Sequence, residues 1–231
     1  LPIVRAALPK RVILPLQQSL GAPAEAVVNP GDVVAEGQKI ADSTKFISVP
    51  LHAPVAGKVA SIGKHPNATG VSVPSIVIEA LEDPPPAPPR LQRLSWRDLD
   101  SDQIRKAVRE AGIVGLGGAT FPAHVKLSPP SEKRIEAVII NGCECEPYLT
   151  IDHRLMLERP ADLLAGAGAI AKAVSAPRLI VGIEDNKPDA LQAVSAEAGR
   201  MGLKEIEIVP LKTKYPQGGE KMLIKAILGR E

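Results

Sequence analysis

The sequence is poor in aromatic side chains, which make up 2% of its 231 residues. So few rings make a broad stacking platform for single-stranded nucleic acid hard to build. The sequence also lacks an excess of charge of one sign, because 28 basic and 26 acidic residues leave a formal net charge of +2. This balance falls well short of the basic stripe expected of a DNA or RNA binder. We therefore expect no nucleic acid partner.

Long apolar runs and cysteines are equally scarce. No stretch approaches the roughly 18 consecutive apolar residues of a membrane-spanning helix, and the N-terminus lacks a charged segment followed by an apolar signal core. We therefore expect a soluble, cytoplasmic chain. Cys143 and Cys145 are the only cysteines and stand one residue apart, which is too close for an easy disulfide and supplies half of the roughly four thiolates of an iron–sulfur cluster. We expect thiols that line a pocket, and no metal site.

The material for a hydrophobic core is present, because 45% of the residues are hydrophobic. A chain of this length allows one large domain or two small ones. The proline-rich run at residues 84–89 is a stiff spacer of the kind that separates two folded bodies. It predicts a first domain over residues 1–82, a linker over 83–94 and a second domain over 95–231. Because the chain starts at Leu1 instead of a methionine, we also expect a piece of a longer protein.

The first part of the chain consists of short apolar runs separated by glycine and proline, a pattern typical of a small all-β sandwich or barrel. The turn residues around Gly31 and Gly57 make it similar to the barrel-sandwich hybrid of lipoyl and biotinyl carriers. Such carriers present a modifiable lysine on an exposed hairpin, but residues 46–52 contain none. We interpret the nearest lysine, Lys45, as an ordinary surface residue. Strands are expected at residues 12–16, 26–28, 39–41, 46–51, 55–62 and 73–80.

The second part changes to alternating helices and strands. Apolar residues at i, i+3, i+4 and i+7 between Asp100 and Ala111 predict an amphipathic helix, with Asp100 or Ser101 as its cap. Runs of β-branched residues then alternate with helices that begin at Pro160 and Pro188. This order predicts an α/β fold, a Rossmann-like parallel sheet with flanking helices of the nucleotide-binding type. Strands are expected at residues 137–140, 179–183 and 206–209.

A glycine cluster at the start of this body is the first candidate site. Gly115, Gly117 and Gly118 allow left-handed torsions and the close approach of a ligand, and Pro122 begins a helix whose free N–H groups would favour a phosphate. Lys126, one turn along, would add a positive charge. A tight turn between two helices explains the same glycines equally well.

Two further clusters strengthen the candidate site. Asn141, Glu144 and Glu146 follow the strand expected at 137–140, and ligands of open parallel sheets bind beyond the carboxyl ends of the strands. An amide and two carboxylates suit the edge of a heterocycle and the hydroxyls of a ribose. The third cluster again joins glycines to a helix start and adds an aromatic ring and a carboxylate. It comprises Tyr215, Gly218, Gly219 and Glu220.

In this order, the three clusters resemble the C subunit of the Rnf (Rsx) electron-transport complex, whose core is similar to the flavin-bearing, NADH-oxidising subunit of respiratory complex I. The resemblance covers the whole chain, from residues 8–16 through the β-rich part to the third cluster. It implies a subunit of a membrane-associated complex that couples electron flow between ferredoxin and NAD to ion transport. Such a subunit would be peripheral to the cytoplasmic face of the membrane and would bind the other subunits of the complex.

The resemblance also implies FMN and NAD(H) as cofactors and assigns residues to each. Hydride would pass directly from the nicotinamide to the flavin, so no catalytic acid or base is expected. The residues implied at the flavin are Gly115, Gly117, Gly118, Lys126, Asn141 and Glu144, with Gly218 and Gly219 in the same pocket. The residues implied at the dinucleotide are Phe121 on the adenine, Glu146, Tyr215 over the shared pocket and Glu220 near the nicotinamide.

Three positions depart from the family pattern. Cys143 stands where the complex I relative has an acidic residue, and Thr120 and His124 replace glycines of the loop, so that extra bulk would narrow the pocket. The family also continues past this C-terminus with further flavin contacts and a domain that holds 4Fe-4S clusters. We therefore expect the isolated chain to bind flavin weakly or not at all.

Two alternatives remain open at this point. The chain could be a non-enzymatic docking scaffold whose β-domain grips neighbouring subunits while its flavin pocket is incomplete. A corrin reductase similar to this subunit fits less well, because here the β-domain precedes the flavin body. Titration with FMN and NADH separates the oxidoreductase from the scaffold.

Overall fold

The computed structural model describes residues 1–82 and 95–230, so the predicted proline-rich linker lies outside the described residues. By its internal contacts the chain divides into two compact units. One unit is Arg5–Pro129, and the other is Pro130–Glu231 together with Leu1–Val4. The first unit thus contains the β-rich segment and also the helix and glycine cluster that follow it in sequence. The domain boundary expected at the proline run stays a prediction.

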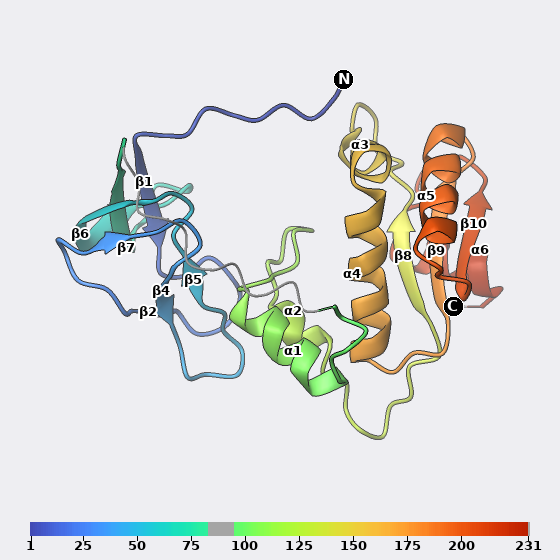
Figure 1. The fold of residues 1–231 in the computed structure, drawn as a ribbon, viewed down its shortest axis with the longest axis horizontal. Coiled ribbons are helices and arrows are strands. Elements are labelled where there is room, and N and C mark those ends of the chain that lie inside the picture. The colour runs from blue at the N-terminus through green and yellow to red at the C-terminus, as the bar shows by residue number, and fades with distance from the viewer. Residues whose placement is uncertain (83–94, 231) are drawn as a thin grey trace. The chain divides into compact units, whose positions relative to one another are not determined.

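The β-rich part of Arg5–Pro129 is built from two small antiparallel sheets, which Figure 1 shows in blue to blue-green. This arrangement confirms the predicted barrel-sandwich hybrid. The first sheet has the order β1 (Arg11–Pro15), β7 (Ser72–Ala80), β6 (Gly57–Pro66) and β3 (Val33–Val34). The second sheet has the order β2 (Glu25–Ala26), β4 (Lys39–Asp42) and β5 (Leu51–His52).

The core of this unit gathers apolar side chains from both sheets. Val34, Ile40, Val59, Ile76 and Ile78 are fully buried and belong to one cluster. Alternate residues of β7 reach this cluster, as expected of a strand, whereas β4 contributes the consecutive residues Ile40 and Ala41. At roughly 1.5–3 kcal/mol per buried aliphatic side chain, these contacts dominate the stability of the β-domain.

The prediction of a strand at residues 46–51 is wrong for most of these residues, because β5 comprises only Leu51–His52. Residues 46–48 contact a neighbouring loop instead of a sheet ladder. The Ala22 N–H donates to Ile47 O at 2.9 Å, and Ser48 Oγ donates to Ala22 O at 2.9 Å. The mostly apolar run at residues 46–51 predicted a strand, but Phe46 and Ile47 are exposed and Ser48 to Pro50 are buried in succession, which is not the alternation of a half-buried strand.

Two helices complete the unit Arg5–Pro129. Helix α1 (Ser101–Glu110) begins as predicted at Asp100, whose side chain accepts from the Gln103 N–H at 2.8 Å, while Gln103 Oε1 accepts from the Asp100 N–H at 2.8 Å. This reciprocal pair is a capping box. Helix α2 (Ala123–Lys126) is a single turn that follows Pro122.

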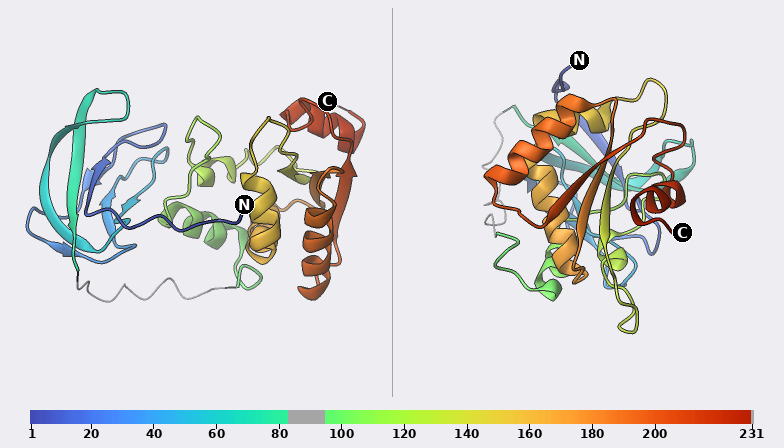
Figure 2. Two further views of the ribbon diagram at one scale, coloured as in Figure 1. Left: turned by 90° about the horizontal axis from the view of Figure 1, so that it is seen from above. Right: turned by 90° about the vertical axis from the view of Figure 1, so that its right-hand side faces the viewer.

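The second unit contains a parallel sheet with the order β10-β9-β8, as the α/β prediction requires. Figure 2 shows helices on both of its faces. The helices expected to begin at Pro160 and Pro188 do so. The elements are β8 (Val138–Gly142), α3 (Ile151–Glu158), α4 (Pro160–Ala173), β9 (Leu179–Glu184), α5 (Pro188–Arg200), β10 (Ile206–Leu211) and α6 (Glu220–Leu228).

The central strand β9 is buried along its whole length, as expected of a strand covered on both faces. On one face, Val181 and Ile183 pack with Met156 of α3, Leu164 of α4 and Val194 of α5. On the other face, a smaller cluster joins the sheet to α6 through Cys143, Leu211 and Leu223. With both faces covered, the carboxyl edge of the sheet is where the loops after β8, β9 and β10 meet.

Candidate nucleotide-binding site

The glycine-rich loop, residues 112–123, is closed by its own backbone. The Gly115 N–H donates to Phe121 O at 2.9 Å, and the Ala123 N–H donates to Ile113 O at 2.9 Å. Gly118 has a φ of +105° and Thr120 a φ of +46°, so both residues need the left-handed region that glycine adopts most readily. No atom lies within 4 Å of a Cβ built on Gly117 or Gly118. Their backbone is therefore open to close approach by a ligand.

Lys126 folds back over this loop from α2. A Cβ built on Gly115 would lie 2.7 Å from Lys126 Nζ, so the glycine leaves room for the ammonium group. Helix α2 is only one turn long, and the Ala123 N–H is already used by Ile113 O. The predicted anion attraction therefore depends on Lys126 and the loop amides more than on the start of α2.

In the other unit, the second and third predicted clusters lie side by side at the carboxyl end of β8. Asn141 Nδ2 donates to Gly218 O at 2.8 Å, and Asn141 Oδ1 accepts from the Cys143 N–H at 3.1 Å. The Gly218 N–H points to Cys145 Sγ at 3.3 Å. A Cβ on Gly218 would lie 2.2 Å from Cys143 O, so only glycine allows the two loops to approach this closely.

Glu144 has a structural task in this arrangement. Its carboxylate accepts from the backbone N–H groups of Asp152 at 3.1 Å and His153 at 3.2 Å. These are free N–H groups of the first turn of α3, where a negative charge is favourable. Burial, followed by the nearby Glu144 carboxylate, raises the pKa of Asp152. Glu144 thereby fixes the path of the loop that carries Glu146.

A pocket of about 400 Å³ opens beyond the carboxyl ends of the three parallel strands. Each of the three strand exits contributes polar side chains to it, as the rule for open parallel sheets predicts. It includes Glu144, Glu146 and Tyr215 from the predicted set. The lining after β8 is Glu144 to Pro147, Leu149, Thr150 and His153; after β9, Glu184, Asn186 and Lys187; after β10, Thr213 to Tyr215.

Glu220 is not among the residues that line this pocket. It opens α6, with Gly219 as the residue before the helix. Together with Asn141 it lines a smaller hollow of about 280 Å³ against Leu223 and Ile224. The structure thus groups Asn141, Gly218 and Cys145 closely, groups Glu144, Glu146 and Tyr215 in the pocket, and places Glu220 at the adjoining hollow.

The sequence reasoning missed a buried ion pair at the end of β9. Lys187 Nζ lies 3.0 Å from Glu184 Oε2, 3.0 Å from Asn186 Oδ1 and 3.3 Å from Glu144 O. Glu184 is 1% exposed and Lys187 is 7% exposed. Glu184 Oε1 is buried and has no hydrogen-bond partner within residues 1–82 and 95–230. Both residues stand at the end of β9, where the rule about strand exits applies, but the sequence pattern gives no sign that they are buried.

The two cysteines are free thiols, Cys143 buried and Cys145 half-buried. Burial, followed by the charge of Glu184, raises the pKa of the Cys143 thiol to about 12, so it stays protonated at neutral pH. Its Sγ lies 3.7 Å from Gly182 O. Across the part of the chain that the structure describes, no three side chains of His, Cys, Asp or Glu form a group that could hold a metal ion.

Lys126, Glu146 and Tyr215 belong to different units, Lys126 to Arg5–Pro129 and the other two to the parallel-sheet unit. The structure brings residues together within each unit, and the expectation of one cleft that contains all three residues stays a prediction. The same holds for the assignment of each residue to flavin or dinucleotide.

Family models match almost the whole chain. Residues 1–83 match the RnfC barrel-sandwich hybrid domain, and residues 108–231 match the Nuo51 FMN-binding domain. One solved structure, the NAD+-reducing [NiFe]-hydrogenase in the air-oxidized state, is similar with a TM-score of 0.53 and 28% identity. That similarity covers 59% of this chain and 25% of the hydrogenase chain.

Curated relatives cover essentially the whole of this chain. It is 45% identical over 96% of its length to the C subunit of the Na(+)-translocating ferredoxin:NAD(+) oxidoreductase complex of Acetobacterium woodii, and 44% identical over 100% to the proton-translocating counterpart of Clostridium ljungdahlii. The C subunit of the ion-translocating oxidoreductase complex of Rhodobacter capsulatus is 42% identical over 97%. The chain spans 50%, 50% and 43% of these relatives, or about half of their length.

Proposed function

Because this chain belongs to the RnfC family, with an RnfC barrel-sandwich hybrid domain followed by a Nuo51 FMN-binding domain, we propose that it binds FMN and NAD(H) within a ferredoxin:NAD oxidoreductase. Electrons would pass between NADH and 4Fe-4S centres in a part of the protein that this chain does not include. The names of the Acetobacterium and Clostridium relatives, which are subunits of ion-translocating complexes, support this proposal.

The observation that carries the proposal is the polar pocket at the ends of β8, β9 and β10. Flavin and dinucleotide bear hydroxyl and N–H groups, and carboxylate and carbonyl oxygens accept hydrogen bonds from such groups. The buried Glu184 Oε1, which has no partner in the described part of the chain, is an acceptor of this kind. The residues present therefore fit a nucleotide whose sugar or ring edge enters the pocket.

Six of the predicted residues have a positioning task in this proposal. Lys126 and the open backbone of Gly117 and Gly118 attract and admit the anionic or electron-rich part of FMN. Asn141 and Glu144 set the backbone of the β8 exit, and Tyr215 covers the pocket. Held by these residues, FMN would supply the redox chemistry, namely hydride acceptance and one-electron transfer. The protein then has only to hold the two cofactors at the right distance.

The same proposal assigns the partners and the location. Other subunits of the complex hold the chain at the cytoplasmic face of the membrane. In residues 1–82 and 95–230, no helix combines the length and apolarity needed to cross a bilayer. Protein–protein contacts are therefore the proposed means of attachment.

The test is a titration of FMN into the full-length protein, followed by flavin fluorescence and then by addition of NADH. We expect FMN to bind and NADH to bleach its absorbance. Lys126→Ala should weaken FMN binding at least tenfold, because a hydrogen bond to a charged group is worth about 1.5–3 kcal/mol. Lys58→Ala, on the exposed side of β6, is the matched control and should change nothing. A full-length protein that binds no FMN would refute the proposal.

The isolated chain provides a second comparison. If the missing part of the protein adds further flavin contacts, residues 1–231 alone should bind FMN more weakly than the full-length protein. Equal affinity would show that this chain already holds every important contact.

A further inference from the structure

We propose that the β-domain is an intramolecular support for the glycine-rich loop, and that His124 is the residue that positions this loop on it. Residues 20–22 and 39–52 of the β-domain contact the segment 109–124, which contains the glycine-rich loop. We call these β-domain residues the supporting edge. Both segments belong to the unit Arg5–Pro129. What the loop binds rests on the proposed function; that the β-domain holds the loop does not.

His124 provides the central contact. It lies on α2 and is 4% exposed. Its Nε2 lies 2.8 Å from Phe46 O, and since a carbonyl can only accept, Nε2 carries the proton. The edge of one ring meets the face of the other, with 5.5 Å between the centroids of Phe46 and His124. One side chain thus joins α2 to residue 46 by both a hydrogen bond and an aromatic contact.

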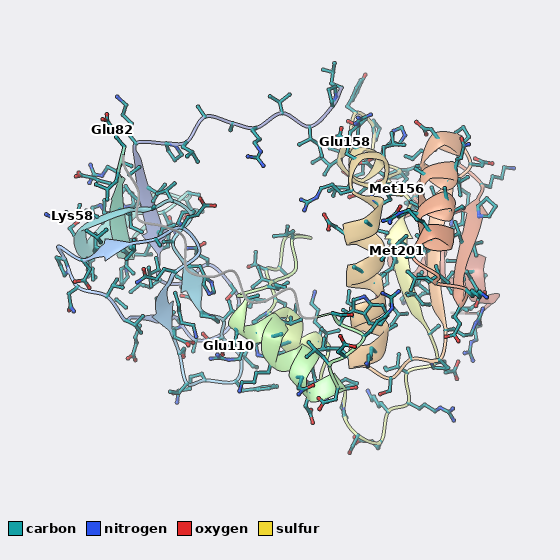
Figure 3. The ribbon with its side chains drawn as sticks, in the orientation of Figure 1. Lys58, Glu82, Glu110, Met156, Glu158 and Met201 are labelled. Atoms are coloured by element: carbon teal, nitrogen blue, oxygen red, sulfur yellow. The ribbon has the colours of Figure 1, made fainter. Side chains whose placement is uncertain are left out.

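A network of ion pairs holds the other end of the segment, where α1 finishes. Lys39 Nζ lies 2.6 Å from Glu110 Oε2 and 2.8 Å from Asp42 Oδ2. Arg109 donates to Asp42 Oδ1 at 3.0 Å and to Ser43 O at 2.5 Å. Figure 3 shows Glu110 at this end of α1. The hydrogen bond from Lys39 lowers the pKa of Glu110, so the network is ionised at neutral pH.

Two further contacts bring the backbone of the glycine-rich loop against the β-domain. The Leu20 N–H lies 3.3 Å from Thr120 O, within the glycine-rich loop itself. Gly112 has a φ of +69°, and a Cβ there would lie 2.6 Å from Pro50 O and 3.3 Å from His52 Nδ1. The chain therefore turns into the loop directly against the supporting edge.

These contacts give residues 46–50 a task other than display of a lysine. Ser48 to Pro50 are buried, and Phe46 O is occupied by His124. A loop rich in glycine has large conformational entropy, and Gly117 and Gly118 have no neighbours of their own to restrain them. Support from the β-domain reduces the ordering that ligand binding would otherwise require.

The experiment compares His124→Leu with His124→Gln in the full-length protein. Glutamine can place an N–H near the position of Nε2 and so retain the bond to Phe46 O, whereas leucine cannot. His65→Leu, on β6, is the matched control. Two readouts are measured: the FMN dissociation constant, and amide hydrogen exchange at residues 113–121 relative to residues 57–66 of β6, which belong to the same unit.

We expect His124→Leu to raise the FMN dissociation constant about tenfold and to speed exchange at 113–121 but not at 57–66. His124→Gln should stay within about threefold of the wild type. A His124→Leu variant with wild-type affinity and wild-type exchange at 113–121 would overturn the proposal, and so would equal faster exchange in both segments, which indicates general loss of stability.

Two further comparisons cover a His124→Leu variant that does not fold and a wild-type protein that binds no FMN. Should His124→Leu fail to fold, the double variant Asp42→Asn, Glu110→Gln tests the ion-pair network instead, because both of these side chains are partly exposed. Unchanged exchange at 113–121 in this double variant would overturn the proposal. Should the wild-type protein bind no FMN, the proposed function fails. The exchange data alone then decide whether the β-domain supports the loop.

Discussion

The two regions predicted to bind the nucleotide are held in place by different means. The glycine-rich loop is closed by backbone hydrogen bonds such as Gly115 N–H to Phe121 O, and its surroundings are contributed by a neighbouring β-domain. The strand-exit loops of the parallel sheet are joined by side chains, chiefly Asn141, Glu144 and Lys187. Side-chain changes within residues 112–123 that leave φ and space unaltered should therefore be tolerated, whereas changes at Asn141, Glu144 or Lys187 should not.

The difference also concerns charge. Lys126 lies over the glycine-rich loop, whereas the lining of the strand-exit pocket includes the carboxyl groups of Glu144, Glu146 and Glu184. A cationic loop suits a phosphate or an electron-rich ring, and a pocket rich in acceptors suits hydroxyl and N–H groups. Under the proposed function, each region therefore offers chemistry suited to a different chemical group of a nucleotide.

The largest expected effect is the loss of the buried ion pair in the strand-exit loops. Lys187→Met leaves the Glu184 carboxylate buried without its cation, which should lower the free energy of unfolding by about 3–5 kcal/mol. Adding Glu184→Gln should recover much of this loss, because no buried charge then remains unpaired. Chemical denaturation measures both variants, with Lys204→Met at an exposed position as the control. Equal stability of Lys187→Met and the wild type would contradict the pair's structural importance.

A smaller loss is expected where two strand-exit loops touch. Gly218→Ala would place a Cβ 2.2 Å from Cys143 O, and relief of that overlap should cost about 1–3 kcal/mol. Gly166→Ala in α4, where a Cβ meets nothing within 4 Å, is the matched control and should stabilise the helix by about 1 kcal/mol. Thermal unfolding midpoints that shift in the same direction would show that the close approach is unimportant.

Asn141→Ala tests one of the side chains that join the strand-exit loops. It removes the bonds to Gly218 O and to the Cys143 N–H. Because Asn141 is exposed to solvent, water replaces part of each lost bond, and we expect a loss of about 1 kcal/mol in thermal unfolding. A loss above about 3 kcal/mol would mean that Asn141 supports more than these two bonds.

The smallest effect should come from the ion-pair network beside the glycine-rich loop. The Lys39 hydrogen bond lowers the pKa of Glu110 below its usual 4.5, so the stabilisation is present above pH 4.5 and is lost as pH falls through the depressed pKa. Since Glu110 is 36% exposed, Glu110→Gln should cost less than about 1 kcal/mol at pH 7. That difference should shrink towards zero in acid. A difference that grows as pH falls would contradict the assignment.

Much of the fold follows from local patterns in the sequence. The polar cap at Asp100, the prolines at 160 and 188 and the β-branched runs predicted helices and strands that the structure confirms within a few residues. Residues 46–51 were predicted as a strand because they are mostly apolar, yet Phe46 and Ile47 are exposed. The hydrogen-bond partner of residues 47 and 48 is Ala22, which lies in a loop. Periodicity reports that a residue is buried and cannot identify what covers it.

The candidate site was predictable where residue type and position coincide. Asn141, Glu144 and Glu146 were singled out because they follow the strand expected at residues 137–140. In the structure Asn141 belongs to β8 itself, and the pocket lining includes Glu144 and Glu146. Glu184 and Lys187 also stand at the end of a strand, but in the sequence they look like ordinary surface charges at the start of a helix. Only the fold shows that both are buried. The role of Glu144 in holding α3 was equally hidden, because its partners are backbone N–H groups that every sequence provides.

The most direct test of the account is amide hydrogen exchange of the full-length protein with and without FMN. We predict that FMN slows exchange in all three segments assigned to it, residues 112–126, 141–148 and 213–220, while residues 57–66 of the β-domain are unchanged. If FMN binds and leaves the three segments unprotected, or protects only residues outside them, the proposed nucleotide site is wrong.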